Sequence, residues 1–333
     1  MDLVCYIPVE FLSVRTETNV VGIRIIPIDD PRIPKANPWF TREKPIGCVV
    51  AIDMEGTSYE QMAEEARAVA SHVLRVLRVA LREHREISYQ QLRFRLSTAY
   101  AFDDQHSGWK QLENAAFDLT LDGELIDLID SQPISTMPAK PSTGIEKAAD
   151  RALCWMERAW FSGEPLVALL FLVFALEALL GDTSEKLKAH ALALRQTMLS
   201  HIVTGEFTHP SETLFLYDKV RSQAVHGEDT PEVNRDIAQR FAWEVRHTLN
   251  QYLMLAREQG LARRGRLLTV LDKHSDRPQV LNWLRHNGGH DWSKYLDELG
   301  AGAGEKRVWQ RFLHFGAIWL HRLGTIWLHP RRR

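Results

Sequence analysis

The hydrophobic period of the chain changes near residue 132, and this change limits the folds that are open to it. Residues 1–54 contain three β-rich runs, VCYIPVEFLSV, VVGIRIIPI and IGCVVAIDM, and the turn-prone segment DDPRIPKANP lies between the last two. After residue 144 apolar residues recur at helical spacing, in segments that end near glycines. Alternation predicts strands and a period of about 3.6 predicts helices. We therefore expect an α+β N-terminal domain followed by a mainly α helical bundle.

The N-terminal domain is expected over residues 1–131. From Ser58 to about Glu86 a helix is predicted by the apolar positions Met62, Ala66, Val69, Val73, Leu77 and Ala80. Arginines gather on another side of this helix, at Arg67, Arg75, Arg78, Arg82 and Arg85. Such a stripe is either a solvated helix face or a surface for phosphates. Residues 87–102 return to alternation, and AAFDLTLDGELIDLI adds a strand and a short helix.

Residues 132–144, QPISTMPAKPSTG, are rich in Pro, Ser and Thr and predict a linker. Five helices are then expected over about 145–161, 165–180, 184–203, 211–226 and 234–258, which together form a bundle over residues 145–260. Residues 261–333 are expected to be a helical C-terminal extension. Within it, PQVLNWLRHNGG and DWSKYLDEL predict short helices, and AGAG predicts a flexible break.

Cysteine usage and the apolar segments indicate the compartment. Cys5, Cys48 and Cys154 are odd in number and form no C-x-x-C pair, which is typical of a reducing environment. The N-terminus lacks the basic and apolar regions of a secretory signal. Residues 165–180 are apolar except for Glu177, and they fall short of the roughly 20 residues that a membrane span needs. We expect a cytoplasmic protein without a membrane span.

Glu177 is the single charge in an otherwise apolar predicted helix, so it requires a partner. Arg221 and His226, in the stretch RSQAVHG, end the predicted helix 211–226 just before Gly227 and could supply one. The bare pattern of Arg followed by His recurs elsewhere, as in Arg67 with His72, so only context singles out this pair. Five residues of α-helix place Arg221 and His226 about 140° apart, so both can face one site only if the last turn loosens.

FALEALLGDTSEKLKAHALAL (174–194) and LYDKVRSQAVHGE (216–228) resemble the HEPN superfamily, most closely its ApeA-like branch linked to antiviral abortive infection. The resemblance covers roughly residues 145–257. It implies helical bundles that pair as a homodimer, so that two Arg-x(4–6)-His motifs form one metal-independent endoribonuclease cleft. Carried over, the motif falls on Arg221 and His226, and Glu177 matches an acidic position on the second helix. Ser222 departs from the family, which commonly has Asn, Asp or His there; serine does not titrate near neutrality, which puts a third catalytic role in doubt.

The resemblance thus implies an endoribonuclease toxin of an anti-phage defence system, with RNA as its substrate, no cofactor, and a regulatory or antitoxin protein as a possible partner. In that chemistry the 2′-OH of RNA attacks the neighbouring phosphate, His226 exchanges protons and Arg221 holds the developing charge. Two alternatives stay open. One is a catalytically inactive HEPN module that binds RNA or nucleotide, or that serves dimerisation or partner docking. The other is a structural network of Glu177, Arg221 and His226.

Two further segments have the composition of a possible ligand site. His286, His290 and Asp291 have a spacing typical of metal ligands, but Gly288 and Gly289 break the helix that would align them, so we expect no metal there. The tail, residues 305–333, interleaves Trp309, Trp319 and Trp327 with basic residues. This composition is typical of single-stranded nucleic-acid binding, of an interfacial helix on an anionic membrane, or of a helix docked on a partner. Docking within the protein or its dimer is the interpretation that we favour.

Overall fold

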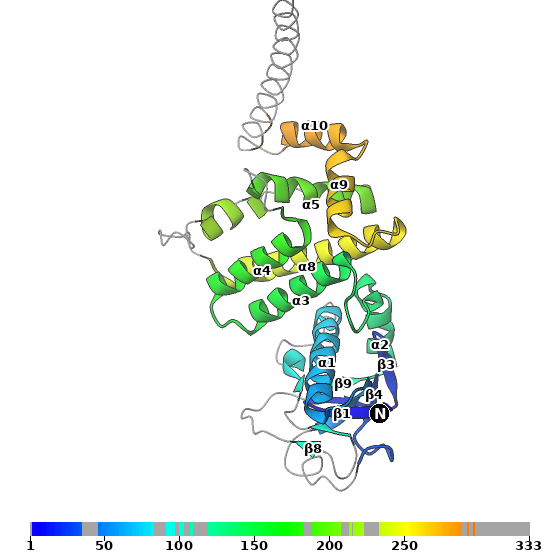
Figure 1. Ribbon diagram of the computed structural model, residues 1–333. Coiled ribbons are helices and arrows are strands. Elements are labelled where there is room, and N and C mark those ends of the chain that lie inside the picture. Colours follow the sequence, from blue (N-terminus) through cyan, green and yellow to red (C-terminus); the bar gives the residue numbers. More distant parts are fainter. Residues whose placement is uncertain are drawn as a thin grey trace, which may run out of the picture.

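The computed structural model describes residues 2–34, 46–82, 91–96, 100–102, 107–108, 119–182, 188–207, 213–214, 216–222, 233–287, 292 and 296. A sheet occupies one end, at the bottom of Figure 1, and a long helix, α1, stands on it. The layer of α3, α4 and α8 follows, and α5, α9 and α10 lie farthest from the sheet (Figure 1). The expected sequence of an α+β part followed by helices is confirmed. The basic tail lies outside the described residues.

The sheet is built around two long antiparallel strands, β1 (Asp2–Glu10) and β5 (Ile46–Glu55). β3 (Thr18–Val20) and β4 (Ile23–Pro27) continue the sheet beyond β5, and β7 (Tyr100–Ala101) and β8 (Ser107–Gly108) continue it beyond β1. Short strands complete the sheet: β2 (Leu12–Val14) runs parallel to β9 (Leu119–Leu121), and β6 (Arg95–Leu96) pairs with β1. The three β-rich runs of the sequence therefore form strands, as predicted.

Helix α1 (Tyr59–Leu81) begins at Ser58, whose side chain accepts a hydrogen bond from the Gln61 N–H. The apolar stripe predicted for this helix is buried throughout. Arg78 differs from both interpretations of the arginine stripe, because it is neither solvated nor on a phosphate-facing surface. It is buried, donates to the carbonyl oxygens of Leu92 and Phe94, and pairs with Glu157. Burial lowers the pKa of Arg78, although the charge of Glu157 opposes this.

Arg75 and Arg78 of this stripe pack against α3 (Gly144–Phe161), so neither side chain is mainly in solvent. Asp150 of α3 lies 2.7 Å from His72 Nδ1 and 3.0 Å from an Arg75 nitrogen. Burial alone would raise the pKa of Asp150, but the hydrogen bond from His72 and the charge of Arg75 lower it overall. Asp150 and Glu157 lie seven residues apart on α3. They contact His72, Arg75 and Arg78, which follow one another at intervals of three residues on α1.

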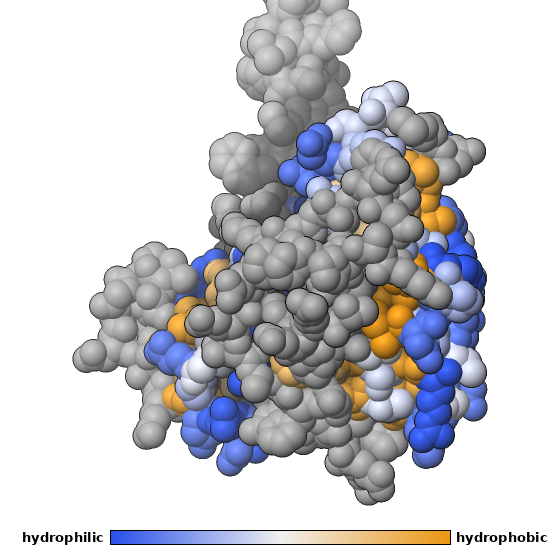
Figure 2. Space-filling model, turned by 90° about the horizontal axis from the view of Figure 1, so that it is seen from below, coloured by the Kyte–Doolittle hydropathy of each residue, from blue (hydrophilic) through white to orange (hydrophobic). Residues whose placement is uncertain are grey.

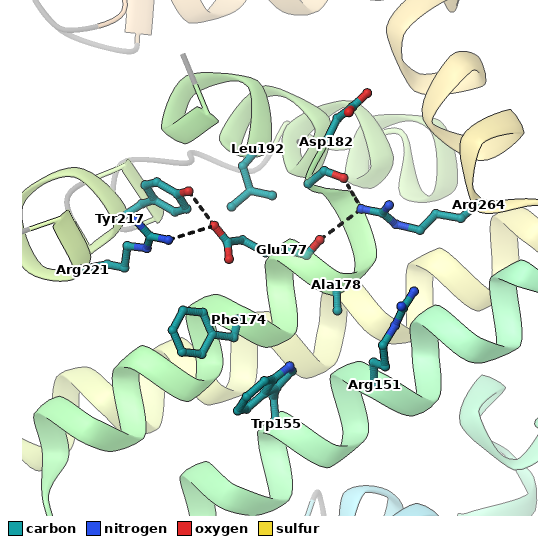
Figure 3. A pocket seen from close by; sticks show the side chains of 11 residues that line it. Arg151, Trp155, Phe174, Glu177, Ala178, Asp182, Leu192, Tyr217, Arg221 and Arg264 are labelled. Carbon is teal, nitrogen blue, oxygen red and sulfur yellow. Dashed lines mark hydrogen bonds and ion pairs between the residues drawn. The ribbon is translucent and has the colours of Figure 1, made fainter. Parts of the chain in front are cut away.

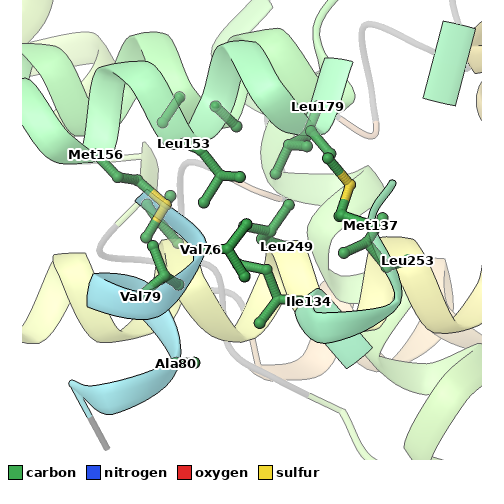
Figure 4. Close-up of a cluster of buried hydrophobic side chains, with 14 of the residues drawn as sticks. Val76, Val79, Ala80, Ile134, Met137, Leu153, Met156, Leu179, Leu249 and Leu253 are labelled. Carbon is green, nitrogen blue, oxygen red and sulfur yellow. The ribbon is translucent and has the colours of Figure 1, made fainter. Parts of the chain in front are cut away.

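The segment expected to be a linker is packed rather than loose. After α2 (Gly123–Asp130), the short helix η3 (Pro133–Thr136) carries Ile134 into the core, and Met137 is buried just beyond it. Gln132 is also buried and donates to the carbonyl of Ala80 at 2.8 Å. Figure 4 shows Ile134 and Met137 among side chains of α1, α3, α4 and α8. The connection therefore belongs to one continuous core, and the domain limits stay a prediction.

The helical part follows the predicted spans closely. α4 (Pro165–Leu180), α5 (Lys188–Thr204) and α8 (Arg235–Glu258) lie within a few residues of their expected bounds, and α3 begins with a capping box of Thr143 and Glu146. The described part of 211–226 contains a π-helical turn, η4 (Leu216–Arg221). α10 (Arg277–Asn287) was expected, whereas α9 (Arg264–Lys273) was not.

Two properties of the surface concern partners. Within the ranges given above, no helix combines the length and the apolar composition that crossing a bilayer requires. Figure 2 shows the molecule from below, where hydrophobic residues reach the surface in a band at the right and hydrophilic residues border it. Phe161 and Trp243 are the large hydrophobic side chains that are most exposed among the described residues, at 50% and 58%.

Candidate functional site

Glu177 on α4 meets two residues of the π-helical turn η4. The hydroxyl of Tyr217 donates to Glu177 Oε1 at 2.5 Å, and an Arg221 terminal nitrogen lies 3.7 Å from the same oxygen (Figure 3). The side chains of Arg221 and Glu177 are 26% and 29% exposed, so this ion pair is half-buried. The partner that the sequence required for Glu177 is thus present, and it comes from the predicted motif.

Tyr217, which lies beside the motif in the sequence, belongs to the site, although the sequence interpretation gave it no role. Its ring lies under the Arg221 guanidinium, with 5.1 Å between the guanidinium carbon and the ring centroid. Burial raises the pKa of Tyr217, and the hydrogen bond to the Glu177 carboxylate raises it further. The spacing of four residues between Tyr217 and Arg221, which puts both on one helix face, is the signal that could have found it.

The π-helical turn is held by apolar residues on its inner side. Leu216 and Val220 are fully buried, so the backbone of η4 is fixed against the core while Arg221 reaches outward from its end. A π-helical turn is wider than an α-helical one and is frequent at functional sites. The helix is therefore loosened over the turn that ends at the motif arginine. Whether the loosening also orients His226 stays a prediction, because that residue lies outside the described ones.

The other end of the site is built by Arg264, at the start of α9. Arg264 donates to the carbonyl oxygens of Glu177 and Leu179, each at 3.1 Å, and to that of Gly181. These carbonyls end α4, where a cation satisfies unpaired acceptors and the helix dipole. Burial lowers the pKa of Arg264, yet arginine keeps its charge in proteins. Sequence reasoning missed Arg264 because it did not predict α9.

Gly181 allows the chain after α4 to lie close to the carbonyl oxygen of Glu177. Its N–H donates to the Glu177 carbonyl at 2.9 Å, and a Cβ on residue 181 would lie only 2.8 Å from that oxygen. Any residue with a Cβ would therefore have to shift position 181 away from the carbonyl oxygen of Glu177. The glycine that marked the helix end in the sequence thus also sets the geometry beside the acidic residue.

A cavity of about 470 Å³ lies between Tyr217 and Arg221 on one side and Arg264 on the other. It is lined by Arg151, Trp155, Phe174, Glu177, Ala178, Gly181, Asp182, Leu192, Tyr217, Arg221 and Arg264. The lining contains three arginines, two acidic residues and three aromatic rings, and Arg221 is the arginine that pairs with Glu177 (Figure 3). The Nε atom of Arg221 is buried and has no hydrogen-bond partner among the described residues. Positive charge beside aromatic surface suits an anionic ligand that carries a flat ring.

The predicted site residues are brought together only in part. Glu177 and Arg221 line the same cavity, and Ser222 follows directly, half-buried and without a side-chain hydrogen bond to any residue that the structure describes. His226 lies outside the described residues, and nothing here tests its role. The catalytic assignment of Arg221, His226, Glu177 and Ser222 accordingly stays a prediction.

Of the three residues with metal-ligand spacing, the structure describes only His286. The Nδ1 atom of His286 is 2.8 Å from the carbonyl oxygen of Asn282 in its own helix, while His290 and Asp291 fall outside the described ranges. In the part of the chain that the structure describes, no group of three or more His, Cys, Asp and Glu side chains is placed to hold a metal ion.

No family model matches the chain, and neither a curated protein nor a solved structure is significantly similar to it. The HEPN resemblance therefore rests on the two quoted sequence segments alone.

Proposed function

We propose that the chain is a metal-independent endoribonuclease that uses Arg221 and His226. The observation that supports this best is the placement of Arg221, which a carboxylate and an aromatic ring hold at the wall of an arginine-lined cavity. An RNA phosphate brings the negative charge that such a wall attracts, and its bases bring flat rings that stack on aromatic side chains.

The reaction needs no cofactor because RNA carries its own nucleophile. The 2′-oxygen attacks the adjacent phosphorus and loses its proton, and the bond from phosphorus to the 5′-oxygen breaks. The leaving 5′-oxygen takes a proton, so the products are a 2′,3′-cyclic phosphate and a 5′-hydroxyl. In this scheme His226 exchanges the protons and Arg221 stabilises the extra negative charge on the phosphorane.

Glu177 and Tyr217 act in this scheme as positioning residues. They hold the guanidinium of Arg221 from two sides, so the arginine does not have to be ordered when RNA binds. Glu177 also offsets part of the charge of Arg221 before substrate arrives. One Arg–His pair per chain is a sparse active site, and a homodimer that brings two pairs together doubles it.

The biological setting of this activity is an anti-phage toxin that a regulatory or antitoxin protein restrains, since an unrestrained ribonuclease would damage its own host. Expression of the wild-type chain is then toxic to a bacterial host, whereas Arg221→Ala at the same protein level is tolerated. Equal tolerance of both chains would remove the toxin proposal while leaving the enzyme proposal open to its own test.

Substitution of the two motif residues tests the enzyme proposal. Arg221→Ala and His226→Ala should each lower the RNA cleavage rate by about 100-fold to 10,000-fold. Because the Arg221–Glu177 pair is half-buried, Arg221→Ala should cost only about 1 kcal/mol of unfolding free energy. Arg266→Ala, at an exposed arginine of α9 outside the cavity, is the matched control and should change neither.

A purely structural network would give the opposite pattern. In that case Arg221→Ala would leave a stranded carboxylate and lower the unfolding free energy by about 3–5 kcal/mol. RNA cleavage would be absent from the wild type as well. Melting curves and cleavage assays on the same protein preparations separate the two outcomes.

A second function, nucleotide binding without cleavage, is favoured by one observation. Residues of α3, α4, η4 and α9 of a single chain line the cavity, so no second chain is needed to form it. This arrangement suits an inactive module that binds a nucleotide. Saturable binding of a mononucleotide that depends on Arg151 and Arg221, without cleavage of any RNA, would support this function against the ribonuclease.

A further inference from the structure

The cavity beside Glu177 carries positive charge at two separate ends. At one end Arg221 pairs with Glu177, and burial and these two charges set the pKa of Tyr217. At the other end burial lowers the pKa of Arg264, and the like charge of Arg151 lowers it further. Figure 3 shows Arg221 and Arg151 at these opposite ends. The cavity can therefore hold two anionic groups of one ligand at separate points.

Arg151 is the arginine of this lining that has no ionic partner. Arg264 donates to three carbonyl oxygens at the end of α4, and the charge of Asp182 acts on it. Arg151, by contrast, is exposed and makes no hydrogen bond or ion pair in the part of the chain that the structure describes. Two neighbouring cations repel one another, and an anion that binds beside Arg151 relieves this repulsion.

The guanidinium of Arg221 keeps its hydrogen-bond donors for a ligand. A terminal nitrogen of Arg221 lies 3.7 Å from the Glu177 carboxylate, which is longer than a hydrogen bond. The face of the Tyr217 ring supports the guanidinium and uses none of its N–H groups. A phosphate at this end can therefore accept hydrogen bonds from Arg221 without breaking one that the structure describes.

The aromatic wall between the two ends offers one ring for a base. Trp155 is already covered by Phe171, with 5.6 Å between the ring centroids, and by Arg158, whose guanidinium carbon is 4.6 Å from the indole centroid. Phe174 contacts Trp155 at 5.2 Å with tilted ring planes, and this is its one ring contact among the described residues. Phe174 is half-buried and lines the cavity. A base can therefore stack on Phe174, whereas Trp155 is a fixed side of the wall.

We propose, on the basis of the ribonuclease function proposed above, that this cavity binds two successive phosphates of one RNA strand. The scissile phosphate lies at Arg221, a neighbouring phosphate lies at Arg151, and a base lies between them on Phe174. Arginine holds a phosphate through two parallel hydrogen bonds, and single-stranded RNA leaves its bases free to stack. Arg151 and Phe174 thus join Arg221 as residues that contact the substrate, and the shortest ligand that binds well carries two phosphates.

Isothermal titration of the full chain with 2′-deoxy dinucleotides measures this binding without cleavage, because these probes lack the 2′-OH. One probe carries only its internal phosphate, and two others carry an additional phosphate at the 5′ or the 3′ end. We expect one of the terminal phosphates to tighten binding to the wild type about 10-fold, and Arg151→Gln to remove that gain. Phe174→Leu should weaken the binding of all three probes about 10-fold, because it removes the stacking surface.

Arg266→Gln, at an exposed arginine outside the cavity, is the matched control and should keep the whole gain. Arg151 is also exposed, so its substitution leaves the fold intact, which melting curves can verify.

Three results would overturn the two-phosphate site. They are equal affinity of the wild type for the three probes, a gain from a terminal phosphate that survives in Arg151→Gln, and no binding of any probe at millimolar concentration. The ribonuclease proposal has a separate readout, which is the cleavage of RNA. A wild type that shows the gain and cuts no RNA would remove the ribonuclease and keep the binding site. A wild type that cuts RNA without the gain would do the reverse.

Discussion

The hydroxyl of Tyr217 donates a 2.5 Å hydrogen bond to Glu177 Oε1 and so ties the π-helical turn to α4. Its ring supports the guanidinium of Arg221, which pairs with the same carboxylate oxygen. Tyr217 thus contacts Glu177 through its hydroxyl group and Arg221 through the face of its ring.

Tyr217→Phe removes the hydrogen bond and keeps the ring beneath Arg221. Hydrogen bonds to charged groups contribute about 1.5–3 kcal/mol, and the partial exposure of Glu177 reduces this. We expect the unfolding free energy to fall by about 1–2 kcal/mol in urea titrations. Tyr217→Leu should fall further because it also loses the ring contact. Equal stability of Tyr217→Phe and the wild type would show that the hydrogen bond is not formed in solution.

The raised pKa of Tyr217 predicts a pH dependence at the alkaline end. The folded state holds the phenol proton more tightly than the unfolded state, whose tyrosines titrate near about pH 10. This contribution to stability is therefore complete below about pH 10 and is lost as the pH rises from there toward the folded pKa.

Absorbance of tyrosinate in the folded protein, followed as the pH is raised, checks this dependence. Burial also raises the pKa values of Tyr6 and Tyr252, so several phenols should titrate late in the wild type, and one fewer should do so in Tyr217→Phe. A wild-type titration in which every tyrosine ionises near pH 10 would contradict the predicted environment of Tyr217.

The contact between α1 and α3 predicts unequal effects of neighbouring arginines. Arg78→Ala removes a buried arginine and leaves Glu157 and two backbone carbonyls without their donor, so we expect a loss of about 3 kcal/mol or more. Arg75→Ala should cost about 1 kcal/mol, because Asp150 keeps its bond to His72. Urea unfolding of both variants provides the comparison. Similar losses for the two variants would mean that Arg78 is not the buried anchor described here.

The proposed active site predicts a homodimer with the two Arg221 residues near its symmetry axis. Light scattering at micromolar concentration should give about twice the chain mass, and cleavage per chain should fall on dilution below the dissociation constant. A stable monomer that cleaves RNA at full rate would show instead that one chain carries a complete site.

The sequence predicted the parts of the fold that depend on local periodicity. The bounds of α3, α4 and α8 follow from apolar spacing and from end signals such as Gly181, and the pairing of Glu177 follows from its being a lone charge in an apolar helix. Those features depend on residues that are close together in the sequence. They can be predicted without knowing which distant segments contact one another.

The parts that were missed depend on contacts between distant segments. An arginine stripe on α1 looks the same in sequence whether water or α3 covers it, so the burial of Arg78 could not be foreseen. The Pro-rich and Ser-rich composition of residues 132–144 hid the two apolar residues, Ile134 and Met137, that anchor it. Arg264 reaches the end of α4 from 83 residues further along the chain, from a helix with weak periodicity.

Analysis of RNA ends after incubation in EDTA tests the central claim most directly. Purified wild-type chain should cut total RNA equally well with and without EDTA, and the fragments should end in 2′,3′-cyclic phosphate and begin with 5′-hydroxyl groups. Arg221→Ala, prepared in the same way, should leave the RNA intact. A strict requirement for Mg²⁺, or fragments that carry a 5′-phosphate, would contradict attack by the 2′-OH at Arg221 and His226.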